Sequence, residues 1–378
     1  MATDTGSEIQ RLHREAPLTD VHAHPSLKAY LFRRNLWRHY WSGSFLNPFS
    51  SRTDFQMLSK GGVGVVVAAH YLPERRLAEC FWIRAAAFLL IPAYSKLMHG
   101  SRFERLLEMV EAMEREVGRR PDRTEVARSY TDLARIRAAG KMAVVHAVEG
   151  AHVLEGELGR LDTLAQRGVA MLTLTHFYPN QVASQVDAIP KDLILRKICD
   201  LDLQPGSGPP LTEFGKEVVR RCVDLGVLVD VTHCTPEARQ AVYREVSGRR
   251  PVVASHVGAQ ALRPDPYNLA DEEIEEIARG GGAIGVIFMP YWLSPSEEKT
   301  GLGSIWATLK HVRDVTGSWD HAMLGTDFDG FTDPPDDVTD ASQLGAVTRM
   351  LLDRGLSEVE IKKILGGNAL RVLQAGWR

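Results

Sequence analysis

Histidines and carboxylates recur along this chain at the ends of short apolar runs. The residues in these places are His22, His24, Glu149, His176, His233, His256 and Asp327. Neutral imidazole nitrogens and carboxylate oxygens are common protein ligands of divalent metal ions such as Zn²⁺. Their repeated placement predicts a metal-dependent active site.

His22 and His24 are the first pair in this set. Residues two apart on a strand share a face, so both rings can reach one metal ion. One such pair is weak evidence, but most of the other apolar runs also end in His, Glu or Asp. Four imidazoles and Glu149 are enough for two divalent metals that share the carboxylate and a hydroxide as bridges.

The remaining candidates have more ordinary explanations. The motif GTDFDG could be a turn with capping aspartates, but its place after the last run favours Asp327 as a catalytic carboxylate. His70, His146 and His152 are interpreted as structural or as neighbours of the site. Asp230 is expected to be structural and to face the surrounding helices, because it alternates with His233.

The elements that must position these residues are eight apolar runs that alternate with helical patterns. Nearly continuous apolar runs are typical of parallel strands covered on both faces. Strand then helix, eight times, predicts an α/β protein with a (β/α)8 TIM barrel, whose active site lies where the strands end. A doubly wound sheet stays open, although no glycine-rich phosphate loop follows the first run. The eight runs are Leu18–His24, Val63–Tyr71, Lys141–Glu149, Val169–Phe177, Val227–His233, Pro251–His256, Ala283–Met289 and Ala322–Phe328.

Two connections are longer than usual. Residues 72–140 are expected to form a helical insertion after strand 2, including a buried or lid helix over Cys80–Tyr94. Residues 179–210 are expected to form a long loop after strand 4 beside the site. Strand-forming sequence resumes after each, so residues 1–378 are expected to be one domain.

Composition narrows the class of protein. The 378 residues are 44% hydrophobic and carry a formal charge of -3, which excludes a disordered chain and gives no excess of basic residues for nucleic acid. Four scattered cysteines suit a reducing compartment. No signal peptide or membrane span is evident, so a cytoplasmic protein is expected.

In order along the chain, several motifs resemble the membrane dipeptidase (renal dipeptidase) family of zinc metallopeptidases. The resemblance implies a binuclear zinc barrel in a homodimer. In it His22 and His24 hold one metal, Glu149 bridges, and His233 and His256 hold the other. It also implies that His176 contacts the substrate carbonyl and that Asp327 handles the proton of the attacking water. The motifs are LHREAPLTDVHAHP, AVEGAHVLEG, LTLTHF, LTEFGKEVV, LGVLVDVTH, PVVASH, GTDFDG and GGNALRVL.

Two positions depart from the family pattern. The family usually has aspartate where this chain has His24, which removes one negative charge from the ligands and should make the bridging water more acidic. The family also has an arginine, which pairs with the dipeptide carboxylate, where this chain has Tyr267. Tyrosine cannot form that bidentate ion pair, and Arg263 is the candidate to replace it.

The leading hypothesis is therefore a zinc-dependent dipeptidase that cleaves the amide bond of a dipeptide-like substrate with a bridging hydroxide. One alternative is a binuclear amidohydrolase acting on another amide, a lactone or an N-acyl compound without a free carboxylate. A second alternative is a noncatalytic metal-binding barrel. Structural metal sites have closed ligand shells and need no proton acceptor, so Asp327 argues against it.

Overall fold

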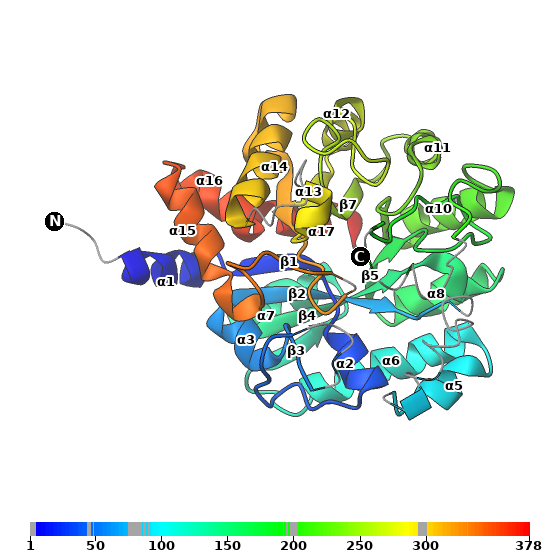
Figure 1. The fold of residues 1–378 in the computed structure, drawn as a ribbon, viewed down its shortest axis with the longest axis horizontal. Helices are drawn as coiled ribbons and strands as arrows, with labels where there is room; N and C mark the ends of the chain where they lie inside the picture. The colour runs from blue at the N-terminus through cyan, green and yellow to red at the C-terminus, as the bar shows by residue number, and fades with distance from the viewer. Residues whose placement is uncertain are drawn as a thin grey trace.

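The protein is described by a computed structural model for residues 5–43, 47, 49–74, 85, 88, 89, 91–191, 193, 196, 203–293, 301–330 and 332–378. Parallel strands form one closed sheet. Helices surround this sheet, as Figure 1 shows. The strands are β1 (Leu18–Ala23), β2 (Val63–Tyr71), β3 (Thr124–Ala127), β4 (Met142–Glu149), β5 (Val169–Thr173), β6 (Leu228–Asp230), β7 (Val252–Val257), β8 (Ala283–Val286) and β9 (Ala322–Leu324).

Eight of these strands make the barrel. Their order is β2-β1-β9-β8-β7-β6-β5-β4, and pairing of β2 with β4 closes the ring. Every pairing is parallel, from Val65 opposite Ala143 to Val286 opposite Leu324. The predicted (β/α)8 barrel is confirmed, and no doubly wound sheet is present in the described part.

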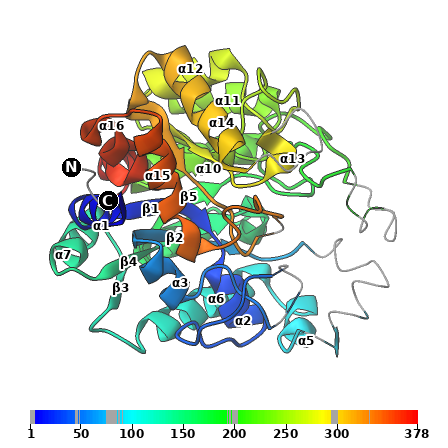
Figure 2. The ribbon, with the colours of Figure 1, turned by 60° about the vertical axis from the view of Figure 1, so that its left-hand side comes forward.

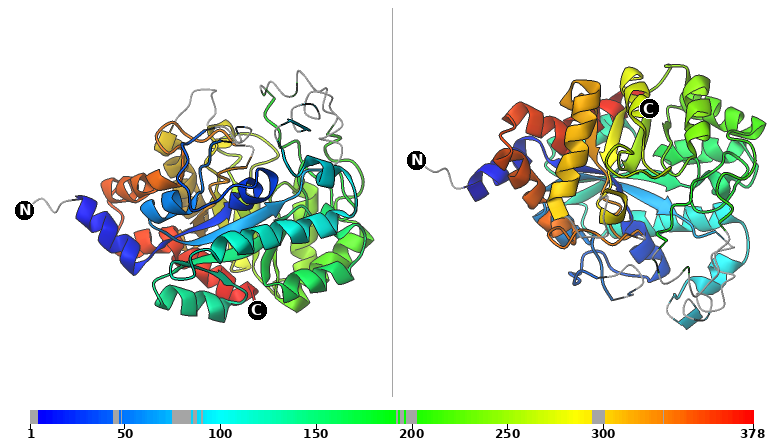
Figure 3. Two further views of the ribbon diagram at one scale, coloured as in Figure 1. Left: turned by 90° about the horizontal axis from the view of Figure 1, so that it is seen from below. Right: turned by 45° about the horizontal axis from the view of Figure 1, so that its top comes forward.

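Helices cover the outside of the barrel in all views (Figures 1–3). α1 lies with α15 and α16 at one side of the molecule, whereas α8 and α10 lie at the other. The helices are α1 (Thr5–Glu15), α2 (Pro25–Leu31), α3 (Phe55–Lys60), α5 (Tyr94–Met98), α6 (Arg102–Val117), α7 (Tyr130–Ala138), α8 (Gly159–Gln166), α10 (Glu213–Leu225), α11 (Pro236–Val246), α12 (Asp271–Arg279), α13 (Pro290–Leu293), α14 (Gly301–Thr316), α15 (Gly345–Asp353), α16 (Glu358–Lys362) and α17 (Asn368–Gly376).

The insertion after β2 contains α5, α6 and α7, as expected, and also the short strand β3. β3 pairs with the first half of β4, from Thr124 opposite Met142 to Ala127 opposite Val145, and β5 pairs with the second half. Most of the helix expected over Cys80–Tyr94 lies outside the described residues. Within it, Phe88 and Leu89 are exposed and Tyr94 begins α5.

Apolar side chains fill the inside of the barrel in a layer contributed by alternate strand positions. Val67, Val145 and Val253 belong to this cluster, together with Val372 and Trp377 near the C-terminus. The C-terminal helix α17 therefore closes the barrel where its strands begin. A π-helical segment, Lys363–Gly367, leads into α17.

The barrel strands are shorter than the sequence pattern predicts. β5 ends at Thr173, β6 at Asp230 and β9 at Leu324, so His176, His233 and Asp327 each follow their strand by three residues. Strand alternation does not govern side chains in such loops. Asp230 was expected to face the helices because it alternates with His233, but His233 lies beyond the end of β6. Within β6, Asp230 shares a face with Leu228, which points into the barrel, so the expected orientation is wrong.

Among the described residues, the structure contains no helix that is both long and apolar enough to cross a membrane.

Candidate metal centre and active site

The side chains of five histidines converge on the carboxylate of Glu149, at the end of the barrel where the strands finish. The Nε2 atoms of His22 and His233 each lie 3.3 Å from Oε1 of Glu149, and His256 Nε2 lies 3.4 Å from it. His24 Nε2 lies 3.5 Å and His176 Nε2 3.6 Å from Oε2. All six side chains are buried.

The backbone aims these side chains through local irregularities. Pairing of β1 with β2 shifts register after Asp20, and His24 is the N-cap of helix α2 and does not continue the strand. His233 and Asp327 have positive φ angles of 67° and 56°, which non-glycine residues rarely adopt. Regular strand geometry would not bring these residues together.

Ser255 fixes the protonation of two of the rings. Its hydroxyl donates to Asp230 Oδ2 at 2.6 Å, so the one hydroxyl proton is used there. The hydroxyl oxygen then accepts from Nδ1–H of His22 at 3.1 Å and of His256 at 2.8 Å. His24 Nδ1 faces the carbonyl oxygen of Ala69 at 3.1 Å and must also be a donor.

These hydrogen bonds place the Nδ1 proton on three histidines, so each ring in its neutral form directs an Nε2 lone pair toward Glu149 and the neighbouring rings. His22 Nε2 lies 3.2 Å from His24 Nε2, and His233 Nε2 lies 3.1 Å from His256 Nε2. Metal-binding histidines typically donate their other nitrogen to an oxygen in this manner. The residues present therefore fit divalent cations, with groups such as His22, His24 and Glu149 within one ligand sphere.

The electrostatics of the centre agree with this fit. Burial lowers the pKa of His22, but the Glu149 charge outweighs it and raises that pKa to about 9. Burial also raises the pKa of Glu149, and the charges of His176 and His22 reverse this and hold it well below its usual value. A proton and a cation thus compete for His22 Nε2.

Glu74 contacts the ring of His176 at Nδ1, on the side opposite the Nε2 atom that faces Glu149. Its carboxylate lies 3.4 Å from His176 Nδ1, accepts from the backbone N–H of Phe177 at 3.2 Å, and accepts from the hydroxyl of Tyr71. Although burial opposes ionisation, His176 lowers the pKa of Glu74 to about 2. Burial likewise opposes protonation of His176, but Glu149 and Glu74 raise its pKa.

Asp327 stands at the open side of the centre. Its Oδ1 lies 2.9 Å from His24 Nε2, and its side chain is 13% exposed whereas the histidines beside it are buried. A Cβ on Gly330 would come within 2.1 Å of this Oδ1, so the last residue of the GTDFDG motif must be glycine. Asp327 can therefore exchange a proton with a molecule held over the centre.

A mostly apolar cavity opens beside Asp327, His176 and His233. Its walls include Tyr267, which is buried, stacks on Trp292 at 4.4 Å, and donates its hydroxyl to the His256 carbonyl oxygen at 2.7 Å. Arg263 is not among the lining residues, and its guanidinium lies over the ring of Tyr291 at 5.2 Å. The described walls of this cavity contain no arginine or lysine.

The histidines that were interpreted as structural or as neighbours of the site form hydrogen bonds or ion pairs outside the metal centre. His70 Nε2 and His146 Nδ1 form a 2.8 Å hydrogen bond, and His146 Nε2 lies 3.6 Å from Glu114 of α6. His152 Nε2 contacts the carbonyl oxygen of Leu72 at 2.9 Å. Sequence reasoning missed Ser255 and Glu74. Ser255 adjoins His256, which was a usable signal, whereas Glu74 lies in a loop without a pattern.

A closed parallel barrel with imidazoles, a shared carboxylate and a partly exposed aspartate at its C-terminal end is the arrangement expected of a metal-dependent hydrolase. The model of the membrane dipeptidase family, peptidase family M19, matches residues 7–376, and the chain belongs to this family. Membership in this family makes the protein a hydrolase of the metallo-dipeptidase type. It gives no support for the two alternatives, a noncatalytic metal-binding barrel and a hydrolase of another class.

Several relatives illustrate the match. Dipeptidase ataJ of Aspergillus terreus is 27% identical over 97% of this chain and 86% of its own length. An uncharacterized dipeptidase of Schizosaccharomyces pombe is 32% identical over 60% of this chain and 51% of its own. The crystal structure of the probable dipeptidase PvdM from Pseudomonas aeruginosa superposes with a TM-score of 0.78 at 21% identity, covering 99% of each chain. A metallopeptidase from Rhodobacter sphaeroides, liganded with a phosphinate mimic of L-Ala-D-Ala, superposes with a TM-score of 0.74 at 22% identity, covering 96% of this chain and 99% of that one.

Proposed function

We propose that the protein hydrolyses the amide bond of small dipeptides or dipeptide-like molecules with two zinc ions. His22, His24 and Glu149 would hold one ion, and His233, His256 and Glu149 the other. The observation that carries the proposal is the convergence of Nε2 lone pairs on one carboxylate with Asp327 beside them. When bound, such ions lower the pKa of water and polarise a carbonyl group.

The chain's own residues then have separate tasks. Asp327 accepts the proton of the attacking water and delivers it to the leaving amine, because its carboxylate is partly exposed beside His24, whereas Glu149 is buried. His176 donates from Nε2 to the developing oxyanion, and Glu74 holds the ring and favours its protonated form. The apolar wall formed by Tyr267 and Trp292 excludes water from the reacting bond.

Metal removal and restoration test this proposal. Dialysis against a chelator should abolish hydrolysis of L-Ala-D-Ala and L-Ala-L-Ala, and two equivalents of zinc per chain should restore it. The choice of probes follows the phosphinate ligand of the Rhodobacter sphaeroides relative. Hydrolysis that persists without metal, or metal-loaded protein that cleaves no dipeptide, would contradict the proposal. Parallel titrations with manganese and cobalt test whether zinc is the preferred ion.

Tyr267 favours a second candidate, hydrolysis of a substrate without a free carboxylate. Its hydroxyl is already donated to a backbone oxygen, and the described cavity wall offers no arginine or lysine for a carboxylate. A panel of dipeptides and their C-terminal amides separates the candidates by kcat/KM. If Tyr267→Arg raises activity on free dipeptides relative to amides, the loss of the cation explains the preference. An unchanged ratio would contradict that explanation.

We also propose that the protein is a cytoplasmic homodimer. Phe88 and Leu89 have exposed fractions of 73% and 80% and are candidates for the contact surface. Light scattering after size exclusion tests the dimer, and Leu89→Asp should then shift the mass toward that of a monomer. A monomeric mass for the unmodified chain would contradict the proposed homodimer.

A further inference from the structure

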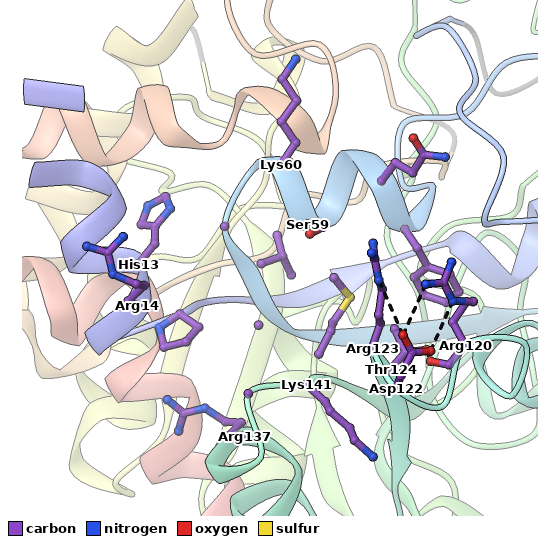
Figure 4. A pocket seen from close by; sticks show the side chains of 18 of the residues that line it. His13, Arg14, Ser59, Lys60, Arg120, Asp122, Arg123, Thr124, Arg137 and Lys141 are labelled. Atoms are coloured by element: carbon purple, nitrogen blue, oxygen red, sulfur yellow. Dashed lines mark hydrogen bonds and ion pairs between the residues drawn. The ribbon is translucent and has the colours of Figure 1, made fainter. Parts of the chain in front are cut away.

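A large cavity lies at the opposite end of the barrel from the metal centre. Its volume is about 1290 Å³, and it is lined by residues that lead into β1, β2, β3 and β4 (Figure 4). The ends of α1, α3 and α7 form its other walls. The end of the barrel where strands begin is not used by the metal centre.

The charge of the cavity wall is strongly positive. Six lysines and arginines line it against two carboxylates, Glu15 and Asp122. The whole chain has a formal charge of -3, so this concentration of cations is local. Three of the cations belong to the insertion after β2. The six are Arg14, Lys60, Arg120, Arg123, Arg137 and Lys141.

The carboxylates of the region balance only part of this charge. Asp122 lies 3.2 Å from Arg120 and 3.8 Å from Arg123, so one anion serves two guanidinium groups. Lys141 pairs with Glu125 at 3.0 Å, and Glu15 pairs with Lys362 at 2.5 Å and with Arg11. Among the carboxylates that the structure describes, none pairs with the other three cations: Arg14, Lys60 and Arg137.

Arg137 lines the cavity with a guanidinium group that is not fully hydrogen-bonded. Its side chain is half-buried at the end of α7, and its Nε is buried without a hydrogen-bond partner in the described structure. Burial of this charge lowers the pKa of Arg137. A buried guanidinium N–H without a partner is costly. In the cavity, the accessible part of the Arg137 guanidinium group can donate to an anion.

The floor of the cavity is apolar. Val63 and Met142 line it at the starts of β2 and β4, with Pro17 before β1 and the aromatic rings of Trp37 and Phe55 nearby. Figure 4 shows Arg14 and Arg137 at one end of the cavity and Arg120 and Arg123 at the other. The lining therefore offers two cationic ends separated by an apolar surface.

We propose that this cavity binds a small organic molecule that carries phosphate groups, with its phosphates at the arginines and its apolar part on the floor. Guanidinium groups match phosphate oxygens in geometry and charge. The cations line a cavity instead of covering a flat face, which favours a molecule of nucleotide size over a polymer. This binding site is independent of the dipeptidase activity.

Calorimetric titration of the zinc-loaded protein with ADP, and separately with pyrophosphate, tests the site. Both should bind saturably, ADP more tightly because it also covers the apolar floor. The double variant Arg14→Gln/Arg137→Gln should lose at least tenfold in affinity. The matched control is Arg244→Gln on α11, an exposed arginine outside the cavity, and it should bind as the unmodified protein does.

Phosphates also coordinate zinc, so the variants decide where the probe lies. ADP binding that is unchanged in the double variant places ADP at the metals and overturns the proposal, as does the absence of binding. Tighter binding of a single-stranded RNA of about twenty nucleotides would also overturn it in favour of a polymer. If the double variant does not fold, the exposed single variants Arg14→Gln and Lys60→Gln should each weaken ADP binding several-fold, and Arg14→Lys should weaken it less than Arg14→Gln.

Discussion

The two ends of the barrel hold their charged groups in opposite ways. At the end where the strands finish, His22, Glu149 and His256 are at most 1% exposed, and hydrogen bonds to neighbouring side chains orient the rings. At the end where the strands begin, the charges of Arg14 and Lys60 are exposed on long side chains.

The difference shows why cavity size is a poor guide to the reactive site. The cavity at the strand starts has the larger volume, but no described lone pairs converge in it. The metal centre is nearly filled by its own side chains. Catalysis requires groups that are already oriented before substrate arrives, whereas binding of an anion tolerates mobile cations. Four predictions test this contrast, from the largest expected effect to the smallest.

Replacement of Asp327 by asparagine should produce the largest change. Turnover should fall by about 10²–10⁴-fold, because the group that transfers the proton is lost while its shape is kept. Metal content, measured by plasma emission spectrometry, should stay near that of the unmodified protein. The exposed Asp353→Asn at the end of α15 is the matched control and should retain full turnover. Full activity of Asp327→Asn would show that another group moves the proton.

Ser255→Ala should weaken metal binding by about 10–100-fold, as is typical when a partner of a metal-binding histidine is removed. Without the hydroxyl, Nδ1 of both His22 and His256 loses its acceptor. Competition with a chromogenic chelator gives the affinity. Ser207→Ala, an exposed serine in the loop between β5 and α10, should leave it unchanged. Equal affinity in both variants would mean that Ser255 does not set the protonation of the rings.

The pH dependence of ligand binding should separate the two ends. The pKa of His22 is about 9, so below this pH a cation must displace its proton. Metal affinity should therefore rise with pH, by about tenfold per unit for one displaced proton between pH 6 and 9. Guanidinium groups do not titrate in this range, so their contribution to ADP binding should be nearly constant. Metal affinity that is independent of pH would contradict the charge balance derived for the centre.

Glu74→Gln should have the smallest effect, a several-fold decrease in kcat with little change in KM. Glutamine keeps the shape but has one acceptor oxygen in place of two, so it can accept from either Tyr71 or Phe177. His176 also loses the charge that favours its protonation. The pKa of Glu74 is lowered to about 2, so its charge stabilises the fold above pH 4.5 and this contribution is lost as the pH falls toward 2. Urea unfolding of the metal-free protein should show less acid destabilisation in the variant. An unchanged kcat would leave Glu74 with a purely structural role.

Much of the barrel could be predicted from the sequence because parallel strands covered on both faces have nearly continuous apolar runs. The residues at the ends of these runs, from His22 to Asp327, lie together at one end of the barrel as expected. β3 escaped prediction because TEVA is short and mixed in polarity. The orientation of the Asp230 side chain was predicted wrongly because strand alternation was assumed to continue to His233, whereas β6 ends at Asp230.

The supporting residues were harder to predict than the ligands. Ser255 acts through hydrogen bonds to two histidines and Glu74 through an ion pair with His176, and such pairs have no fixed spacing in the sequence. The cations of the opposite cavity come from four separate segments and are diluted by the acidic residues of the whole chain. Net charge therefore gave no indication of that cavity, and only the folded arrangement brings its residues together.

The positive φ angles of His233 and Asp327 have a consequence for thermal stability. Each such conformation costs on the order of 1–3 kcal/mol for a residue with a side chain. Asp327→Gly should therefore yield a protein that melts at a higher temperature than Asp327→Asn, although neither could transfer the proton. The two conformations therefore lower the stability of the fold locally, at residues that lie in the metal centre.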